Sequence, residues 1–214
     1  MKRLLLLCVG ACLLVAPAAQ AALRVLACEP EWAALTRELA GDLAEVDSAT
    51  TALQDPHRIE ARPSLLATAR RADLVVCTGA ELEIGWLPLM QRQTGNGAIQ
   101  PGQPGYFEAS AQVPLLERPT RLDRAQGDIH AAGNPHVHLD PHRIATIAQA
   151  LAQRLAQLDP ANAARYAQHN TDFQIRWQAA ITRWETQGAS LRGVPVMVHH
   201  KNFSYLADWL GLAV

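Results

Sequence analysis

The sequence lacks several signatures that mark common classes of protein. It has no HExxH motif, which excludes a zincin metalloprotease, and no CxxC pair of the kind that holds structural zinc. No internal repeat or low-complexity tract interrupts it, and no apolar stretch after the first residues approaches the length of a membrane span. What is left is a globular chain of 214 residues, enough for one large domain or two small ones.

Neither sign of charge predominates. The chain has 19 Lys and Arg residues against 20 Asp and Glu residues, so without Lys2 and Arg3 its net charge is −3. Such weak acidity gives no reason to expect nucleic acid or an anionic membrane as a partner.

Residues 1–21 have the pattern of a secretory signal peptide. Lys2 and Arg3 form a basic start, residues 4–15 an apolar core, and residues 19–21 a small-x-small cleavage site. An uncleaved anchor is one alternative. A lipoprotein anchored at Cys12 is another, which the apolar run beyond that cysteine disfavours. We therefore expect an exported protein.

Cysteine is rare, and only Cys28 and Cys77 remain after the expected cleavage. An even pair in an exported protein favours a disulfide. Both residues end apolar runs typical of buried parallel strands, and a bridge is reasonable if those strands are neighbours. Two buried free thiols are the alternative, and metal ligation by the pair is disfavoured.

The first half of the chain alternates between strand and helix patterns. Such alternation predicts an α/β fold with a parallel sheet covered by helices. The expected strands are residues 23–28, 44–50 and 73–79, and the expected helices are residues 30–41, 62–71 and 81–94, the last one broken near Pro88. A further strand is expected at 113–117, after a stretch rich in glycine and proline, and an irregular loop at 120–135.

The second half is mainly helical. Residues 140–158 form an alanine-rich helix, and Asp159 and Pro160 begin a long one that ends near Gly188. Its aromatic stripe is most simply core packing. A strand at 193–198 and a helix at 202–210 follow, and the chain stops where another strand would begin, so we expect a fragment of a longer protein.

Three histidines stand far apart in the chain, each just past a strand-like or turn segment: His57, His136 and His200. Neutral imidazoles are the commonest nitrogen ligands of borderline-soft divalent metals. Ligands so widely spaced exclude a zinc finger. The pattern predicts a cleft that holds a metal between two halves of the molecule.

Several short segments follow one another along the chain: Asp55-Pro56-His57, residues 72–76 (ADLVV) followed by Gly79, Gly133-Asn134-Pro135-His136, Leu139-Asp140-Pro141, and residues 200–206 (HKNFSYL). In this order they resemble the substrate-binding proteins of bacterial ABC importers for zinc and manganese, the cluster A-I family. No segment is specific alone, but their order and intervals are, and together they cover nearly all of the chain after residue 21.

The resemblance implies a two-lobed metal-binding-protein fold. Residues 22–158 would form the first lobe, 159–188 a long rigid linking helix, and 189–214 the incomplete start of the second lobe. His57, His136 and His200 would be the metal ligands, with His200 preferred over His199 because it precedes the FxYL pattern. A fourth ligand, an aspartate in the family, would lie beyond residue 214.

The ligand type predicts the cargo, and the resemblance implies the partner. Three imidazoles suit Zn²⁺, whereas manganese sites favour carboxylate oxygen, and manganese-type members of the family typically carry glutamate at the position of His200. We expect a monomeric periplasmic protein that captures zinc and delivers it to an inner-membrane ABC permease. It would not be an enzyme.

Asp128, His130 and His138 are additional candidate ligands. Asp128 and His130 lie in the expected loop before His136, where they would capture zinc or receive it from a periplasmic chaperone. A mobile polar loop is the alternative.

The competing hypothesis is a zinc hydrolase of the metallo-β-lactamase type, which the segment HVHLDPH (residues 136–142) superficially resembles. Pro141 displaces the last histidine of that motif by one residue, and Asp140-Pro141 is typical of a helix start, so this hypothesis is disfavoured.

Overall fold

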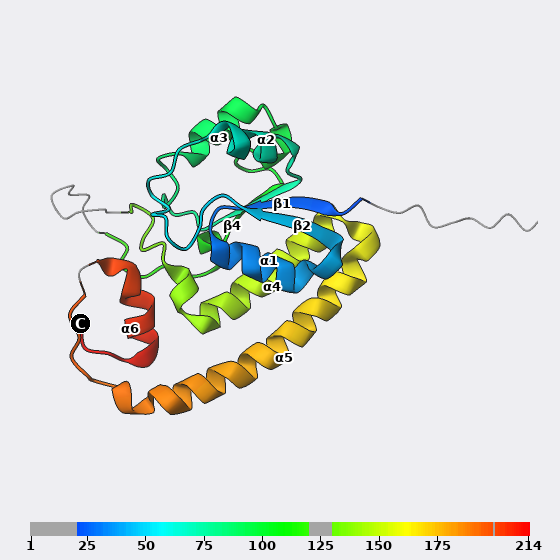
Figure 1. The fold of residues 1–214 in the computed structure, drawn as a ribbon. Helices are drawn as coiled ribbons and strands as arrows, with labels where there is room; N and C mark the ends of the chain where they lie inside the picture. The colour runs from blue at the N-terminus through cyan, green and yellow to red at the C-terminus, as the bar shows by residue number, and fades with distance from the viewer. Residues whose placement is uncertain (1–20, 120–129, 199) are drawn as a thin grey trace, which may run out of the picture.

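The structure, a computed structural model, describes residues 21–119, 130–198 and 200–214. Its centre is a four-stranded parallel sheet in the order β2-β1-β3-β4 (Figure 1). The strands are β1 (Leu23–Ala27), β2 (Ala44–Ser48), β3 (Leu74–Cys77) and β4 (Tyr106–Glu108). This confirms the expected α/β class.

Helices cover both faces of the sheet, and the strand residues alternate accordingly. Val25 and Ala27 belong to the core beneath α1 (Pro30–Ala40) and α4 (Pro141–Leu158). Leu26 and Cys28 belong to the opposite core, beneath α2 (Pro63–Arg71) and α3 (Leu87–Thr94). Every residue of β3 is buried, as expected of a central parallel strand between two helical layers.

A 26-residue helix, α5 (Ala163–Gly188), follows the short turn η6 (Pro160–Asn162) and packs along α1 and α4. At 1.5 Å per residue it is about 39 Å long. Tyr166, Phe173 and Ile181 on one side of it are buried, which confirms core packing for this part of the aromatic stripe, whereas Trp184 near its end is 37% exposed. The helix carries the chain from the sheet to α6 (Ser204–Leu210) at the other end of the molecule (Figure 1).

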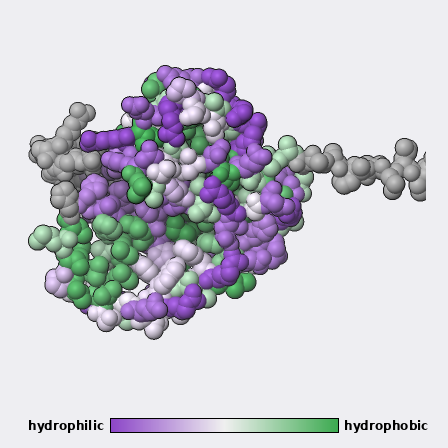
Figure 2. All heavy atoms as spheres, viewed as in Figure 1, coloured by the Kyte–Doolittle hydropathy of each residue, from purple (hydrophilic) through white to green (hydrophobic). Residues whose placement is uncertain are grey.

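The segment after α5 is only partly regular. The strand expected at 193–198 is wrong, because only Pro195 among these residues forms a β-bridge, a parallel one with Ala213. The expected helix is confirmed as the turn η8 (Lys201–Phe203) followed by α6. Figure 2 shows apolar side chains gathered at this end of the molecule, where several large ones are exposed: Leu191, Val194, Met197, Phe203 and Val214.

Two further predictions in the first half are corrected. The helix expected from residue 81 begins only at Leu87, because Gly79, Ala80 and Glu81 all have positive φ, and Pro88 lies in its first turn. The fourth strand is β4 and not residues 113–117, which bond across to other loops instead. Leu116, for example, exchanges backbone and side-chain hydrogen bonds with Asn134 and Tyr205.

Cys28 and Cys77 form a disulfide between the carboxyl ends of β1 and β3, as their strand positions predicted. None of the helices in the described ranges is both long enough and apolar enough to cross a membrane.

Candidate metal centre

Three separate loops bring His57, His136 and His200 together. His57 lies between β2 and α2, His136 directly before the turn η5 (Val137–Leu139) that leads into α4, and His200 directly before η8. One donor nitrogen from each lies within 4.8 Å of the other two. The ring centroids are 6.1 Å apart for His57 and His136, 6.2 Å for His57 and His200, and 5.7 Å for His136 and His200.

The His57 ring is oriented by its own loop. The carboxylate of Asp55 accepts the backbone N–H of His57 at 3.0 Å and lies 2.8 Å from Nδ1. The indole of Trp86 donates to the Pro56 carbonyl at 2.8 Å and so fixes the preceding residue. A proton on Nδ1, shared with Asp55, leaves the lone pair on Nε2, which is buried and has no hydrogen-bond partner among the described residues.

His136 is the most buried of the three, with 8% of its surface exposed. Its backbone N–H donates to Asn134 Oδ1 at 2.9 Å. Burial, and next the charges that the neighbouring imidazoles would carry, lower the pKa of His136 to about 3. The ring is therefore neutral at pH 7, which is the form that binds a metal ion.

The additional candidates lie around this cluster without completing it. His130 has its ring 5.5 Å from that of His57, and His138 has its ring 6.0 Å from that of His136. His138 Nδ1 lies 3.5 Å from Glu31 Oε1, and burial lowers the pKa of His138 against the opposing effect of that carboxylate. Asp128 lies outside the described residues.

The HVHLDPH segment does not assemble a hydrolase site. Asp140 caps α4 by accepting the backbone N–H groups of His142 and Arg143, and its carboxylate pairs with the Arg143 guanidinium. His142 points to Glu185 on α5, at 2.8 Å. Two members of the proposed dinuclear set are thus engaged elsewhere, because Asp140-Pro141 starts a helix, as the sequence indicated.

A second buried polar group, which the sequence did not reveal, lies beside the disulfide. Glu83 is 2% exposed, and its carboxylate accepts the backbone N–H groups of Thr78 at 2.7 Å and Gly79 at 3.1 Å. Glu29 is 3% exposed and accepts the Thr78 hydroxyl at 3.0 Å. The only available signal was Glu29 directly after the apolar run that ends at Cys28, since Glu83 follows a single leucine between two glutamates.

Burial raises the pKa of both carboxyl groups. The pKa of Glu83 rises to about 7, and that of Glu29 rises well above its usual range through burial and then the negative charge of Glu83. Glu83 also lies within 4.8 Å of both cysteine sulfurs. Because those sulfurs are joined to each other, they offer no thiolate to a metal ion.

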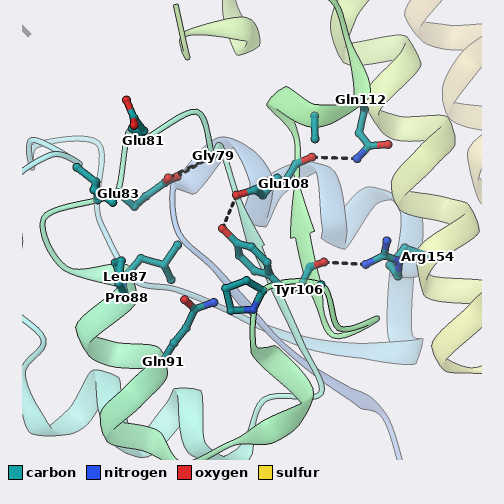
Figure 3. A pocket seen from close by; sticks show the side chains of 14 residues that line it. Gly79, Glu81, Glu83, Leu87, Pro88, Gln91, Tyr106, Glu108, Gln112 and Arg154 are labelled. Atoms are coloured by element: carbon teal, nitrogen blue, oxygen red, sulfur yellow. Dashed lines mark hydrogen bonds between the residues drawn. The ribbon is translucent and has the colours of Figure 1, made fainter. Parts of the chain in front are cut away.

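Glu83 also lines a cavity of about 430 Å³ next to the edge strand β4. Figure 3 shows that its polar groups largely bond to one another: Tyr106 donates to Glu108, Gln112 to the Glu108 carbonyl, and Arg154 to the Tyr106 carbonyl. None of the clustered histidines lines it. The Arg154 guanidinium also donates to the Pro104 carbonyl, and so covers part of the exposed edge of the sheet beside β4.

Comparison with known proteins agrees with the histidine geometry. The sequence model of the family described as zinc-uptake complex component A, periplasmic (ZnuA), matches residues 25–214. The chain belongs to this family. The match covers the segments that carry all three histidines, and it supports the resemblance drawn from the motifs.

The individual relatives have low sequence identity to this chain and are longer than it. The high-affinity zinc uptake system protein ZnuA of Bacillus subtilis (strain 168) is 23% identical over 182 residues, 83% of this chain and 55% of that protein. The manganese ABC transporter substrate-binding lipoprotein scaA of Streptococcus gordonii is 28% identical over 144 residues, 67% of this chain and 44% of that protein. The chain spans about half the length of these curated relatives.

A crystal structure of ZnuA superposes with a TM-score of 0.74 at 22% identity, covering 90% of this chain and 70% of that one. This likeness shows the fold, a parallel sheet flanked by helices. The names of these relatives describe a zinc uptake system protein and a substrate-binding lipoprotein of a manganese ABC transporter, in agreement with the resemblance drawn from the motifs.

Proposed function

We propose that this protein is the metal-binding component of an ABC importer, which captures a divalent ion in the periplasm and delivers it to an inner-membrane permease. The predicted signal peptide and the family assignment support this location and partner. The protein would make no covalent bond. It would act by differential binding, because a permease that recognises the loaded form selects the state that the ion stabilises.

The observation that carries the proposal is the convergence of His57, His136 and His200. Three imidazole nitrogens from three loops lie within 4.8 Å of one another, and one of them, His57 Nε2, is buried with no hydrogen-bond partner among the described residues. Burying polar atoms in this way is unfavourable unless a ligand satisfies them. A metal ion would satisfy all three nitrogens at once.

We further propose that the ion is Zn²⁺. Imidazole nitrogens suit zinc, and three of them with one further donor complete a tetrahedral site. The curated relatives include both zinc and manganese proteins, so the choice of zinc rests on the three imidazoles and the lack of a carboxylate among them. His130 is the additional imidazole that we propose for contact with the ion, and His138 and Asp128 are weaker candidates.

The test is a competitive zinc titration of the purified protein against a chromophoric chelator. We expect one tightly bound ion, and a loss of at least about 100-fold in affinity in each of His57→Ala, His136→Ala and His200→Ala, since each removes a nitrogen that would bind the ion directly. His142→Ala is the matched control, because His142 bonds to Glu185 and should leave the affinity unchanged. Binding that is insensitive to His57 or His200 would refute the site.

Metal selectivity and supply need separate measurements. A parallel titration with Mn²⁺ should give much weaker binding than with Zn²⁺, and equal affinities would refute the choice of zinc.

We also propose that a periplasmic chaperone supplies zinc through the loop before His136. Unchanged transfer from a zinc-loaded donor to protein lacking residues 124–132 would refute that partner.

A further inference from the structure

Asn134 lies two residues before His136 and is only 5% exposed. We propose that this side chain is a positioning residue, which holds the backbone of His136 and the backbone next to His200 at the separation that a shared metal ion requires. The inference rests on the proposed function and adds a residue that never touches the ion.

The carbonyl oxygen of the Asn134 side chain binds the first of the two segments. Asn134 Oδ1 accepts the backbone N–H of His136 at 2.9 Å. This bond closes a tight turn through Pro135 and fixes the direction in which the His136 ring leaves the chain.

The amide nitrogen of the same side chain binds the second segment. Asn134 Nδ2 donates to the backbone carbonyl of Lys201, directly after His200, at 2.7 Å. It also donates to Glu117 Oε2 at 2.8 Å. Both N–H groups and the carbonyl oxygen of one buried amide are therefore engaged, and the amide joins two loops that lie 67 positions apart in the sequence.

Neighbouring groups close the network. The buried Tyr205 hydroxyl donates to the Asn134 backbone carbonyl at 2.6 Å and accepts the Leu116 N–H at 3.1 Å. The Ser204 hydroxyl donates to Glu117 Oε1 at 3.1 Å. Residues from the loop before His136 and from the start of α6 thus bind each other through four side chains: Glu117, Asn134, Ser204 and Tyr205.

Because this network already holds the loops of His136 and His200 together, a bound ion does not have to bring them to the right separation. Groups that orient the ligands of a metal from outside the first shell typically contribute about 10- to 100-fold in affinity. If the bonds of Asn134 are removed, the loop of His200 is no longer tied to that of His136, and binding must then restore their separation. The loss should appear in affinity and in coordination geometry, beyond any general loss of stability.

The experiment compares Asn134→Ala and Asn134→Asp with Asn170→Ala. Asn170 is a matched control, since it is also 5% exposed and bonds through its amide to Gln149 and Gln174, between α4 and α5. Each protein is titrated with zinc, loaded with Co²⁺ for its visible absorption spectrum, and unfolded in urea without metal.

We expect Asn134→Ala to lower zinc affinity about 10- to 100-fold and to alter the Co²⁺ spectrum. Asn134→Asp should lose at least as much, because it keeps the acceptor for His136 but replaces the amide donors with a charge facing Glu117. Asn170→Ala should destabilise the fold and leave affinity within about twofold. Tyr205→Phe, which keeps the buried ring, should show a smaller loss of affinity and tests the network if Asn134→Ala fails to fold.

Wild-type affinity and an unaltered Co²⁺ spectrum in Asn134→Ala, or in Tyr205→Phe if Asn134→Ala is unfolded, would overturn the inference while leaving the proposed function intact. Equal losses in Asn134→Ala and Asn170→Ala would also overturn it, because stability alone would then explain the effect. Failure of the wild-type protein to bind zinc would instead refute the proposed function.

Discussion

The histidine cluster and the Glu83 carboxylate are two buried polar groups that differ in how their atoms are satisfied. The Glu83 carboxylate is satisfied by the backbone of Thr78 and Gly79. His57 Nε2, in contrast, has no partner among the described residues and lies near two other imidazoles. The comparison shows that burial of a polar group does not by itself mark a binding site. One unsatisfied atom does not mark it either, because Glu29 Oε1 is also buried without a partner among the described residues. The distinguishing feature is that nitrogens of three imidazoles from separate loops converge.

The largest expected effect is a loss of stability on removal of the Glu83 carboxylate, with little change in zinc affinity. Glu83→Ala leaves two buried N–H groups without an acceptor and should lower the free energy of unfolding by about 3 kcal/mol. Zinc affinity of the folded variant should change by less than about threefold. Urea unfolding of metal-free protein measures the first quantity and chelator competition the second.

Glu81→Ala is the control for this variant, because Glu81 accepts an exposed N–H of Ala131 and should cost less than about 1 kcal/mol. Equal losses in Glu81→Ala and Glu83→Ala would mean that the buried carboxylate is not a structural acceptor.

The next expected effect is on the pH dependence of stability, to which His136 and Glu83 contribute with opposite signs. Metal-free folded protein keeps His136 neutral down to a pKa of about 3, whereas the unfolded chain protonates it near 6.5, so its contribution to stability rises with pH between those values. Folded protein keeps a proton on Glu83 up to a pKa of about 7, whereas the unfolded chain releases it near 4.5, so this contribution falls as pH rises between those values.

Between pH 4.5 and 6.5 the two contributions oppose each other. The double variant Glu29→Gln/Glu83→Gln should therefore make the slope of stability against pH more positive by about 1.4 kcal/mol per pH unit for each of the two carboxyls that holds its proton in the folded state. Urea unfolding with chelator present, at half-unit steps across this window, measures the slope. An unchanged slope would show that neither carboxyl holds a proton in the folded state.

The smallest expected effect concerns the orientation of His57. Asp55→Ala removes the carboxylate beside Nδ1 and should reduce zinc affinity about 10- to 100-fold. Stability should hardly change, because the Asp55 carboxylate is exposed. Asp42→Ala removes another exposed carboxylate, paired with Arg165 far along the chain, and should leave zinc affinity as it is. If both variants bind zinc like the wild type, Asp55 does not orient the ring.

Much of the fold could be predicted from the sequence because the central strands are short apolar runs between segments with a helical pattern that begin at proline. Residues 25–28 and 74–77 are runs of this kind, and the structure pairs the strands that contain them directly. The edge strand β4 was missed because its three residues follow a stretch rich in glycine and proline, and their pairing with β3 depends on tertiary contacts. The helix start at Leu87 was missed because the left-handed turn at Ala80 and Glu81 has no local sequence signature.

The convergence of the three histidines could be predicted from the sequence, but the contacts that hold their loops in place could not. His57, His136 and His200 lie in short motifs that can be compared with a known family. The contacts of Asn134 run to Glu117 and Lys201, which are distant in sequence and become neighbours only when the loops pack. Likewise, Glu29 and Glu83 meet only because β1 and β3 are adjacent in the sheet.

The disulfide has a consequence for proteolysis. It closes a ring of chain from Cys28 to Cys77 that contains His57 and the turn around Leu53, which is 98% exposed. A protease that cuts at this turn opens the ring but releases nothing, because the bridge still joins the two pieces. The bridge would keep the fragment that holds β1, α1 and β2 attached to the fragment that holds all three histidines, and only a gel run under reducing conditions would reveal the cut.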